Sequence, residues 1–266
     1  MIQKIVISGS SGRMGRVLLS GVLADENMSL YAALDAEGSP SLGEDAGVLC
    51  GLPACGVTVS NALADLDKAD CLIDFTRPQG SIRYLQHCSR KGVSAVVGTT
   101  GFSVQEQREV EAYAKIIPIV QAPNMAVGVN VVFNLLEEAA QLLPDGYDVE
   151  VLEAHHRYKV DAPSGTALHM GRIIADAMGL DLADAVFGRQ GYTGARGARQ
   201  IGFSAIRGGD IVGDHTVMYL GDGERIEITH KTANRKPYVN GSLLAARFLA
   251  DRPAGLYSMH DVLSQG

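Results

Sequence analysis

The chain has 266 residues, of which 46% are hydrophobic and 20% are charged. This length suits one large domain or two small ones, and this composition is typical of a globular protein with a core of its own. The formal net charge of −7 argues against a nucleic-acid partner, because proteins that bind the phosphate backbone are usually basic.

Membrane and export signals are the next classes to consider. No apolar run reaches the roughly 18 residues that cross a bilayer, and the first residues, MIQKIVISG, lack the long apolar region of a signal peptide. We therefore expect a cytoplasmic protein with no membrane partner. The cysteines form no CxxC pair and fit no zinc spacing, so we expect reduced, structural thiols at Cys50, Cys55, Cys71 and Cys88.

Short apolar runs alternate with helical segments in the first half of the chain. The run KIVISG at 4–9 is followed by helical spacing at 12–24. Further strand-like runs lie at 29–35, 71–76, 93–98 and 117–122. Near-continuous apolar strands that alternate with helices indicate a parallel sheet covered on both faces. Handedness rules then favour an α/β fold with a Rossmann-like doubly wound domain.

The glycine-rich turn GSSGRMG follows the first of these runs and opens a helix. Gly9, Gly12 and Gly15 permit a tight turn and a close approach of the backbone to a pyrophosphate, whose charge a helix N-terminus attracts. The spacing is GxxGxxG rather than GxGxxG, and a tight turn without a ligand is the alternative. Asp35, 20 residues after Gly15 at the end of the next strand, favours dinucleotide binding.

Asp35 also bears on the choice of cofactor. A carboxylate can accept hydrogen bonds from a ribose but disfavours a 2′-phosphate, which carries roughly −1.5 to −2 charge. The next residue, Ala36, supplies no compensating cation. Arg13 can reach a phosphate from the glycine-rich turn. The sequence therefore favours NADH without excluding NADPH.

Two more strand ends carry turn sequences, GTTG at 98–101 and APNM at 122–125. In open α/β sheets the ligand lies outside the carboxyl ends of the strands. Both segments are therefore placed to contact the nicotinamide half of a cofactor. Ordinary loops are the alternative for each segment.

The pattern changes after about residue 126. Helical spacing predicts helices over 127–143 and 164–179, with a strand over 147–156 between them. Strand-like runs follow at 199–209, 214–223 and 225–233. Gly-Gly-Asp and Gly-Asp-Gly between these runs are typical of hairpin turns. We expect a smaller α+β domain with a mostly antiparallel or mixed sheet, and a last helix near 241–250.

The segment EAHHRYKVDAPSGTA at 153–167 concentrates cations in an acidic chain. Neighbouring side chains on a strand point to opposite faces, and no nearby residue offers a convincing third ligand, so we expect no metal. If His155 and His156 serve one site, the strand must end near residue 155 and the chain must bend.

Acid/base chemistry is the other possibility for this segment. Lys159 is protonated at neutral pH if its pKa is the ordinary value of about 10.4, and a histidine such as His155, with an ordinary pKa of about 6.5, can transfer a proton near neutrality. Ser164, Gly165 and Thr166 open a helix whose N–H groups form an anion site. The residues alone leave two interpretations open: acid/base groups beside a carboxylate site, or a solvated cationic loop with a helix cap.

The same segment resembles the signature E-x-H-H-x-x-K-x-D-A-P-S-G-T-A of the 4-hydroxy-tetrahydrodipicolinate reductases, also called dihydrodipicolinate reductases. The resemblance extends along nearly the whole chain, to GSSGRMGR, DFTRP, GTTGF, APNMAVGVN, GFSAIRGGDIVGDHT and ITHKTANR. It implies an NAD(P)H-dependent oxidoreductase of lysine/diaminopimelate biosynthesis. Such an enzyme reduces 4-hydroxy-tetrahydrodipicolinate to tetrahydrodipicolinate with loss of water.

The resemblance also implies roles for individual residues. His155 would be the proton donor/acceptor and Lys159 the proton donor after hydride transfer. The substrate carboxylates would be held by His156, Gly165 and Thr166. The cofactor contacts would be Gly9, Ser10, Ser11, Gly12, Arg13, Met14, Asp35, Gly98, Thr99, Thr100, Ala122, Pro123, Asn124 and Met125.

For the domains, the resemblance implies a dinucleotide-binding domain at 1–126 plus 236–266, and a substrate-binding domain at 127–235 that forms a homotetramer. Ala36 stands where some members carry an arginine thought to hold the 2′-phosphate, which again favours NADH. Tyr158 stands where some carry histidine and leaves the His-His-x-x-Lys frame intact. Another two-domain nicotinamide dehydrogenase would explain the glycines but not 153–167. A nucleotide-sensing regulator would bind cofactor without turnover.

Overall fold

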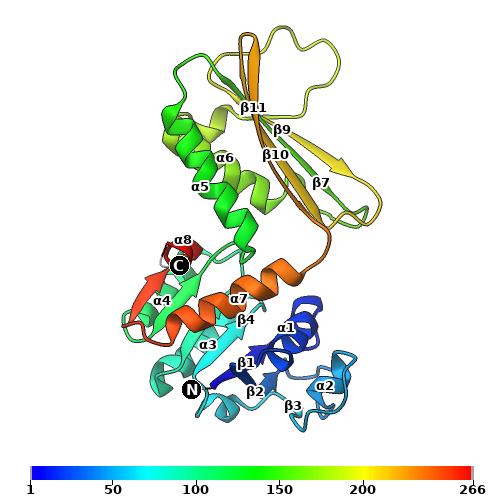
Figure 1. Ribbon diagram of the computed structural model, residues 1–266, viewed down its shortest axis with the longest axis vertical. Helices are drawn as coiled ribbons and strands as arrows, with labels where there is room; N and C mark the ends of the chain where they lie inside the picture. Colours follow the sequence, from blue (N-terminus) through cyan, green and yellow to red (C-terminus); the bar gives the residue numbers. More distant parts are fainter. Residues whose placement is uncertain (1, 265–266) are drawn as a thin grey trace. The chain divides into compact units, whose positions relative to one another are not determined.

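The computed structural model describes residues 2–264 of the chain, which Figure 1 shows coloured from the N-terminus to the C-terminus. Contacts divide it into two compact units, Met1–Val127 with Lys236–Gly266 and Gly128–Arg235. The chain passes from the first unit to the second at the start of helix α5 (Val127–Leu142) and returns at helix α7 (Lys236–Leu249). Each unit has a sheet of its own.

The first unit is built on a seven-stranded sheet in the order β12-β6-β5-β4-β1-β2-β3, in which every pair is parallel. Its strands are β1 (Gln3–Ser8), β2 (Met28–Leu34), β3 (Val59–Ser60), β4 (Cys71–Asp74), β5 (Ser94–Val97), β6 (Pro118–Gln121) and β12 (Gly255–Tyr257). The strand order reverses between β1 and β4, which makes this the point where ligands bind in doubly wound sheets. The predicted Rossmann-like sheet is confirmed.

Helices cover both faces of this sheet. Successive residues of β1 point to opposite sides, so Ile5 and Ile7 join a core cluster with helices α1 and α7, while Val6 joins a cluster with α3 and α4. The helices of the unit are α1 (Arg13–Leu23), α2 (Ala46–Leu49), α3 (Pro78–Lys91), α4 (Val104–Ala114), α7 and α8 (Met259–Leu263), with a 3₁₀ turn η1 (Leu63–Leu66). Both faces of the sheet are therefore buried, as its apolar strands require.

Helix α7 fixes the segment that follows β6. A Cβ atom at Gly241 would lie 1.7 Å from the carbonyl oxygen of Met125, so only glycine fits this approach. Val239 and Leu243 of the same helix are buried against the core that includes α1. Helix α7 begins at Lys236, five residues before the helix expected near 241–250.

The second unit has a five-stranded mixed sheet in the order β11-β10-β7-β9-β8. The strands are β7 (Asp148–His155), β8 (Val186–Phe187), β9 (Ile201–Arg207), β10 (Gly213–Gly221) and β11 (Glu224–Thr232). Strand β10 runs antiparallel to β7 and β11, whereas β9 runs parallel to β7 and β8. A mixed sheet was one of the two expected arrangements.

One of the two predicted hairpins is wrong. The Gly-Asp-Gly turn at 221–223 does join β10 to β11 as a hairpin. The Gly-Gly-Asp sequence at 208–210 does not make a hairpin, because β7 lies between β9 and β10 and pairs with both. Turn-forming residues show where the chain changes direction, but not which strand becomes its neighbour.

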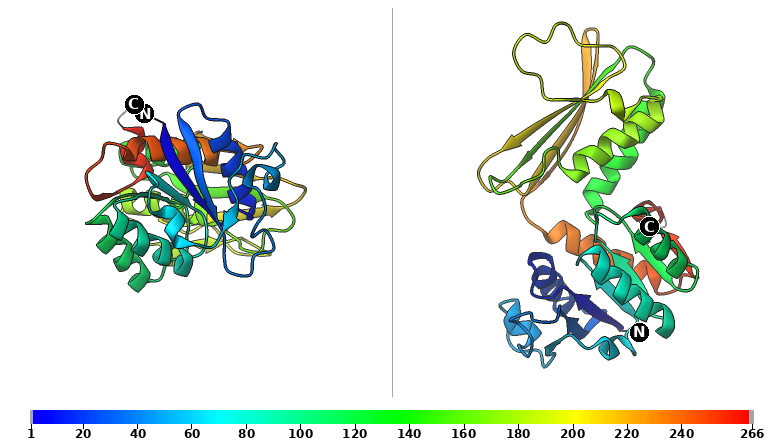
Figure 2. Two further views of the ribbon diagram at one scale, coloured as in Figure 1. Left: turned by 90° about the horizontal axis from the view of Figure 1, so that it is seen from below. Right: turned by 180° about the vertical axis from the view of Figure 1, so that it is seen from behind.

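Helices α5 and α6 (Gly165–Met178) lie on one side of this sheet (Figure 2). Tyr219 of β10 donates a hydrogen bond to the carbonyl of Leu136 on α5, and a Cβ at Gly171 of α6 would lie 2.4 Å from the Phe203 ring of β9. Side chains of β7 alternate in burial, and the buried set is Val149, Val151, Glu153 and His155. Two polar side chains thus end the buried face of β7. None of the helices within residues 2–264 is long and apolar enough to cross a membrane.

Candidate active site

The glycine-rich turn lies at the carboxyl end of β1. Gly9 has a φ of +66°, which favours glycine, and a Cβ at Gly15 would lie 2.1 Å from the Gly9 carbonyl oxygen. The turn therefore packs tightly against the start of α1, where Gly12 is the N-cap. The first N–H groups of a helix have no partner within that helix, so they point at any ligand that lies on this turn.

Asp35 lies directly beside this turn. The Ser11 N–H donates to Asp35 Oδ2 at 2.9 Å, and the Ala36 N–H donates to Oδ1 at 2.8 Å. Gly9, Ser11, Gly12 and Asp35 line one cavity with a volume of about 610 Å³. This volume falls within the range of small-molecule and cofactor sites. The structure therefore brings the two halves of the predicted nucleotide motif together.

The other predicted residues of the turn differ in exposure. The Ser10 hydroxyl oxygen is fully buried, has no hydrogen-bond partner among the described residues and does not line this cavity. Arg13 is exposed, and its side chain is free to approach a phosphate. Met14 packs against the core, so only its backbone is available to a cofactor.

Sequence reasoning did not identify the opposite wall of this cavity. That wall comes from the end of β4 and from α3, and includes Thr76, Arg77, Arg83 and Tyr84. The signal was present in DFTRP, because β4 neighbours β1 across the reversal of strand order. Arg77 and Arg83 add positive charge to a cavity for which the sequence analysis considered only Asp35 and the glycine-rich turn with Arg13.

A second cavity of about 370 Å³ lies at the ends of β5 and β6. Thr99 and Thr100 line it together with Ala122 and Pro123, so the two predicted segments meet around one space. A Cβ at Gly98 would lie 2.3 Å from the Phe75 ring, which requires glycine at this strand end.

The remaining two residues of the second segment are buried. Asn124 accepts a hydrogen bond from the Ala126 N–H at 2.9 Å. Met125 belongs to the hydrophobic core. The side chain of Met125 is therefore turned away from solvent, and any contact with a ligand falls to its backbone.

A buried carboxylate connects the strand ends beneath both cavities. Asp74, at the end of β4, is 1% exposed and accepts hydroxyl hydrogen bonds from Ser8, Thr76, Ser81 and Thr99. These donors come from β1, the β4–α3 connection, α3 and the end of β5. Asp74 therefore fixes these four segments relative to one another.

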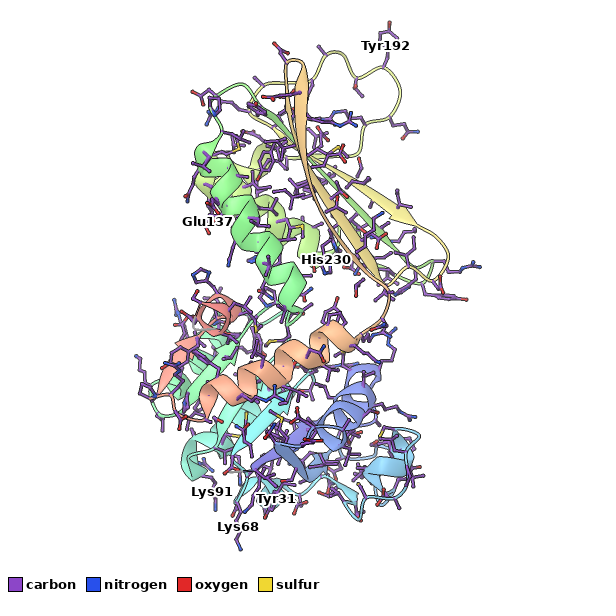
Figure 3. All side chains as sticks on the ribbon, viewed as in Figure 1. Tyr31, Lys68, Lys91, Glu137, Tyr192 and His230 are labelled. Atoms are coloured by element: carbon purple, nitrogen blue, oxygen red, sulfur yellow. The ribbon has the colours of Figure 1, made fainter. Side chains whose placement is uncertain are left out.

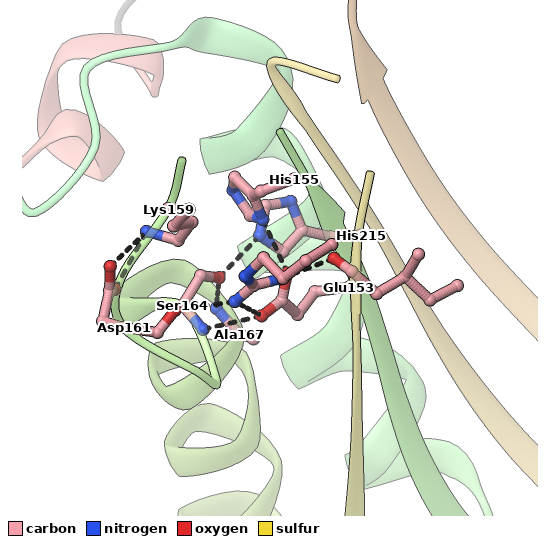
Figure 4. A network of polar contacts seen from close by, with 9 residues as sticks. Glu153, His155, Lys159, Asp161, Ser164, Ala167 and His215 are labelled. Atoms are coloured by element: carbon pink, nitrogen blue, oxygen red, sulfur yellow. Dashed lines mark hydrogen bonds and ion pairs between the residues drawn. The ribbon is translucent and has the colours of Figure 1, made fainter. Parts of the chain in front are cut away.

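In the second unit, β7 ends at His155, one residue before the end of the strand predicted over 147–156 and at the point that a site shared by His155 and His156 requires. His155 Nδ1 lies 2.6 Å from Glu153 Oε2, since the two residues share the buried face of the strand. Arg207 of β9 donates to both oxygens of Glu153 at 2.7 Å, and the Ser164 N–H donates to Oε1 at 3.0 Å. Figure 4 shows this network at close range.

The surroundings of Glu153 and His155 favour an ionised Glu153 beside a neutral His155 ring. Burial raises the pKa of Glu153, but the hydrogen bonds from Arg207 and His155 outweigh it and leave that pKa below its ordinary value. Burial lowers the pKa of His155, and Glu153 only partly offsets this effect. A neutral His155 that donates through Nδ1 has Nε2 left as its acceptor. A Cβ at Gly213 would lie 3.2 Å from Nε2, so the glycine leaves space at this edge of the ring.

The chain bends after His155, as sequence reasoning required for a common site. The His156 N–H donates to the Ile211 carbonyl at 2.7 Å, and the Lys159 N–H donates to the His156 carbonyl at 3.1 Å. The Lys159 ammonium donates to both oxygens of Asp161, at 2.8 and 2.9 Å. His156 Nδ1 is buried and unpartnered within residues 2–264.

The N-terminus of α6 follows this bend. Ser164 is the N-cap and accepts from the Ala167 N–H at 3.1 Å, while Gly165 is exposed with open space around its Cα. Thr166, in the first turn, is partly buried. Helix N-termini of this kind attract carboxylates. The residues predicted to hold carboxylates thus lie in the same unit as His155 and Lys159, the residues predicted to transfer protons.

Sequence reasoning did not identify His215 of β10 as part of this cluster. His215 Nε2 lies 3.0 Å from the Ser164 hydroxyl, and its ring packs edge-on against His155 with centroids 5.1 Å apart. Burial lowers the pKa of His215 to about 4, so this ring is neutral at pH 7. Over the described residues, no group of three or more histidine, cysteine and acidic side chains is arranged to hold a metal ion.

Comparison with known proteins shows which family the sequence of this chain matches. Family models for dihydrodipicolinate reductase match residues 3–125 (N-terminus) and 128–263 (C-terminus). A 4-hydroxy-tetrahydrodipicolinate reductase of Dechloromonas aromatica (strain RCB) is 56% identical over 261 residues, covering 98% of this chain and 97% of the relative.

Solved structures are similar over the same length. A dipicolinate-bound dihydrodipicolinate reductase from Paenisporosarcina sp. TG-14 has a TM-score of 0.78 at 27% identity, covering 97% of this chain and 98% of that one. GenD2 from gentamicin A biosynthesis, in complex with NAD, has a TM-score of 0.59 at 14% identity, covering 98% and 90%. The second likeness concerns the fold alone.

Proposed function

The chain belongs to the dihydrodipicolinate reductase family, and from this premise we propose that its first unit binds the nicotinamide cofactor and its second unit the dicarboxylate substrate. The protein is an NAD(P)H-dependent oxidoreductase of lysine/diaminopimelate biosynthesis. It reduces 4-hydroxy-tetrahydrodipicolinate to tetrahydrodipicolinate with loss of water. The observation that carries this function is the 56% identity to a reductase of that name over nearly the whole of both chains.

The cofactor, when bound, supplies the hydride. The glycine-rich turn and the N-terminus of α1 would bind its pyrophosphate, and the ends of β5 and β6 its nicotinamide half. The contacts would come from Gly9, Ser10, Ser11, Gly12, Arg13, Asp35, Gly98, Thr99, Thr100, Ala122, Pro123 and Asn124, with Met14 and Met125 contributing through their backbones.

NADH is the favoured cofactor in this proposal. Asp35 and Glu37 both line the first cavity, and two carboxylates disfavour a 2′-phosphate. Ala36 lies between them without a charge. Arg77 and Arg83 line the same cavity, so NADPH is also admitted.

In the second unit, the substrate carboxylates would bind to His156, Gly165 and Thr166 at the N-terminus of α6. Lys159 lies close by, paired with Asp161, whose side chain is 56% exposed. Exposed ion pairs contribute about 0–1 kcal/mol, so a substrate that carries two carboxylates can compete for the ammonium group.

Two proton transfers then complete the reaction. Neutral His155, acting through Nε2, takes a proton from the substrate ring and gives it to the hydroxyl group, which leaves as water. Lys159 supplies the proton that accompanies the hydride, so one hydride and one proton enter the product. An ammonium group suits this role because it carries the proton that it donates.

We further propose a homotetramer that forms through the second unit, in the cytoplasm. The face of the sheet opposite α5 and α6 carries Leu152, Ile206 and Met218, all at least partly exposed. The 188–200 loop carries the fully exposed Tyr192 (Figure 3). Such apolar exposure suits an interface between subunits. All four cysteines are free, as a reducing compartment predicts. Light scattering of the purified protein tests the proposed homotetramer, and the mass of a monomer would contradict it.

An enzymatic assay tests the function. The unstable substrate is generated in place from pyruvate and aspartate semialdehyde with the upstream synthase, and nicotinamide absorbance is followed. We expect oxidation that depends on both the synthase and this protein. If neither NADH nor NADPH is oxidised, the proposed function is wrong.

A further inference from the structure

Glu153 is a buried carboxylate that the reaction proposed above does not use. It is 1% exposed, yet its two oxygens accept hydrogen bonds from three separate elements. These are the His155 ring on its own strand and the Ser164 N–H at the N-cap of α6, both labelled in Figure 4, and the Arg207 guanidinium on β9.

We propose that Glu153 and Arg207 are positioning residues for His155, and that the same carboxylate ties the ring to the N-terminus of α6. Glu153 fixes the tautomer and the orientation of the ring, and Arg207 fixes Glu153. This inference rests on the proposed roles of His155 and of α6 in the reaction.

The hydrogen-bond inventory determines the tautomer. An ionised carboxylate only accepts hydrogen bonds, so His155 Nδ1 must carry the proton it shares with Glu153 at 2.6 Å. In a neutral imidazole the other nitrogen, Nε2, is then the acceptor. Glu153 therefore leaves Nε2 as the ring atom that exchanges protons with a substrate. A partner that fixes the tautomer in this way is a recurring means of orienting a histidine.

The strand register explains why Arg207 performs this task. Arg207 is the β9 partner of His155, and residues two apart on a strand share a face, so its guanidinium reaches Glu153 across the sheet. It donates Nη1 to Oε2 and Nη2 to Oε1, both at 2.7 Å. A third hydrogen bond joins Arg207 Nη2 to the Asp161 carbonyl at 2.7 Å. Arg207 thus ties Glu153 to the loop that carries Lys159.

Other charged and titratable groups surround the ring. The cations of Lys159 and Arg207 oppose protonation of His155. From β10, His215 packs against the ring at 5.1 Å between centroids, and His230 of β11 pairs in register with His215. The carboxylate of Asp161, in the loop, accepts a hydrogen bond from the Lys159 ammonium. Glu153 is therefore the carboxylate that bonds the ring directly, and the ring's orientation depends on it.

A glutamine at this position cannot replace the carboxylate. Each Glu153 oxygen accepts an N–H from Arg207, so either orientation of a glutamine amide places an NH₂ group against an Arg207 donor. Glu153→Gln therefore keeps the shape of the side chain but loses part of the network.

The strand also supplies a matched control. Glu150, on the other face of β7, accepts hydrogen bonds from the same kind of fork, the Arg189 guanidinium, at 3.0 and 2.9 Å. Its hydrogen-bond partners include no histidine ring. Glu150→Gln makes the same chemical change on the same strand without touching His155.

The experiment is solid-state ¹⁵N NMR of histidine-labelled full-length protein with NADH bound, which distinguishes the two neutral tautomers. His155 is assigned by the signal that disappears in His155→Asn. We expect the Nδ1–H tautomer in the wild type and in Glu150→Gln, and a loss of that tautomer in Glu153→Gln. The kcat of Glu153→Gln should fall by about 10- to 100-fold, as for outer partners of ligating histidines, while the KM for NADH stays constant.

Retention of both the Nδ1–H tautomer and kcat in Glu153→Gln would overturn the inference. If that variant does not fold, Arg207→Met replaces it, since the arginine side chain is partly exposed. Glu153 then stays but loses the donors that fix it, so a partial loss of the Nδ1–H tautomer and of kcat is expected. The proposed function is judged separately, because an active His155→Asn would refute the role of His155 while leaving the tautomer result in place.

Discussion

The Lys159 ammonium donates hydrogen bonds to both carboxylate oxygens of Asp161, at 2.8 and 2.9 Å, two residues further along the chain. The pair lies in the bend between β7 and α6, with 19% of the lysine side chain exposed. Asp161 holds the ammonium beside the N-terminus of α6 without burying it. The lysine side chain therefore lies close to the proposed carboxylate site before any substrate arrives.

Removal of this lysine should affect turnover and leave cofactor binding unchanged. We expect Lys159→Ala to lower kcat by about 10²- to 10⁴-fold, the range for loss of a general acid, with the Kd for NADH near that of the wild type. Steady-state kinetics and NADH fluorescence titration measure the two quantities. A large loss of NADH affinity would show that Lys159 contributes to cofactor binding rather than to proton transfer to the substrate, which would contradict this prediction. Lys91, which pairs with Asp67 on the surface of the first unit, is the matched control for loss of an ion-paired lysine.

Asp35 should govern cofactor affinity instead. Its carboxylate lines the first cavity, so Asp35→Ala should raise the KM for NADH with little change in kcat. The same variant should narrow the preference for NADH over NADPH, because it removes the charge that opposes a 2′-phosphate. Kinetics with both cofactors at physiological salt provide the check. A wild-type kcat/KM that is much higher for NADPH would contradict the preference.

Much of the first unit was predictable because its signals are local. Apolar runs and a glycine turn specify strand, turn and helix within a few residues, so the glycine-rich turn and Asp35 were found together. The end of β7 near His155 followed from strand alternation together with the assumption that His155 and His156 serve one site, since adjacent side chains on a strand diverge. The residue types at 153–167 left both a catalytic site and a solvated loop open, and only the resemblance to the family signature decided between them.

Contacts between distant segments were not predictable in the same way. Arg207 and His215 reach Glu153 and Ser164 across 54 and 51 residues, through a register that no local pattern specifies. The same limitation explains the wrong hairpin at 208–210, because local turn residues carry no information on the insertion of β7 between β9 and β10. Arg77 and Arg83 were missed because they reach the cavity from the neighbouring strand β4 and helix α3.

The buried histidine of β10 should make stability depend on pH. Burial lowers the pKa of His215 to about 4 from its ordinary 6.5, so the unfolded chain binds a proton there before the folded protein does. Stability from this group is full above pH 6.5 and is lost as pH falls from 6.5 toward 4, by at most about 1.4 kcal/mol per pH unit. Urea unfolding at fixed protein concentration, between pH 7.5 and about 5.5, should show a shallower loss for His215→Gln than for the wild type. Equal slopes would contradict this assignment.

The carboxylate beneath the cofactor cavities should be a major determinant of stability in the first unit. Asp74→Ala leaves the hydroxyl groups of Ser8, Thr76, Ser81 and Thr99 without their shared acceptor. Each unsatisfied buried polar group costs about 1–3 kcal/mol, so we expect a total loss of at least about 3 kcal/mol. Thermal unfolding measures it. Asp74→Asn, which keeps one acceptor oxygen, should lose less, and the surface carboxylate variant Asp67→Ala should leave Tm nearly unchanged.

The most direct test of the central claim is the rate of NADH oxidation with substrate generated in place by the upstream synthase, measured at saturating NADH for the wild type, His155→Ala and Lys159→Ala. The wild type should turn over, and each variant should lose about 10²-fold or more in kcat while still binding NADH. No turnover by the wild type, or undiminished turnover by both variants, would contradict the account.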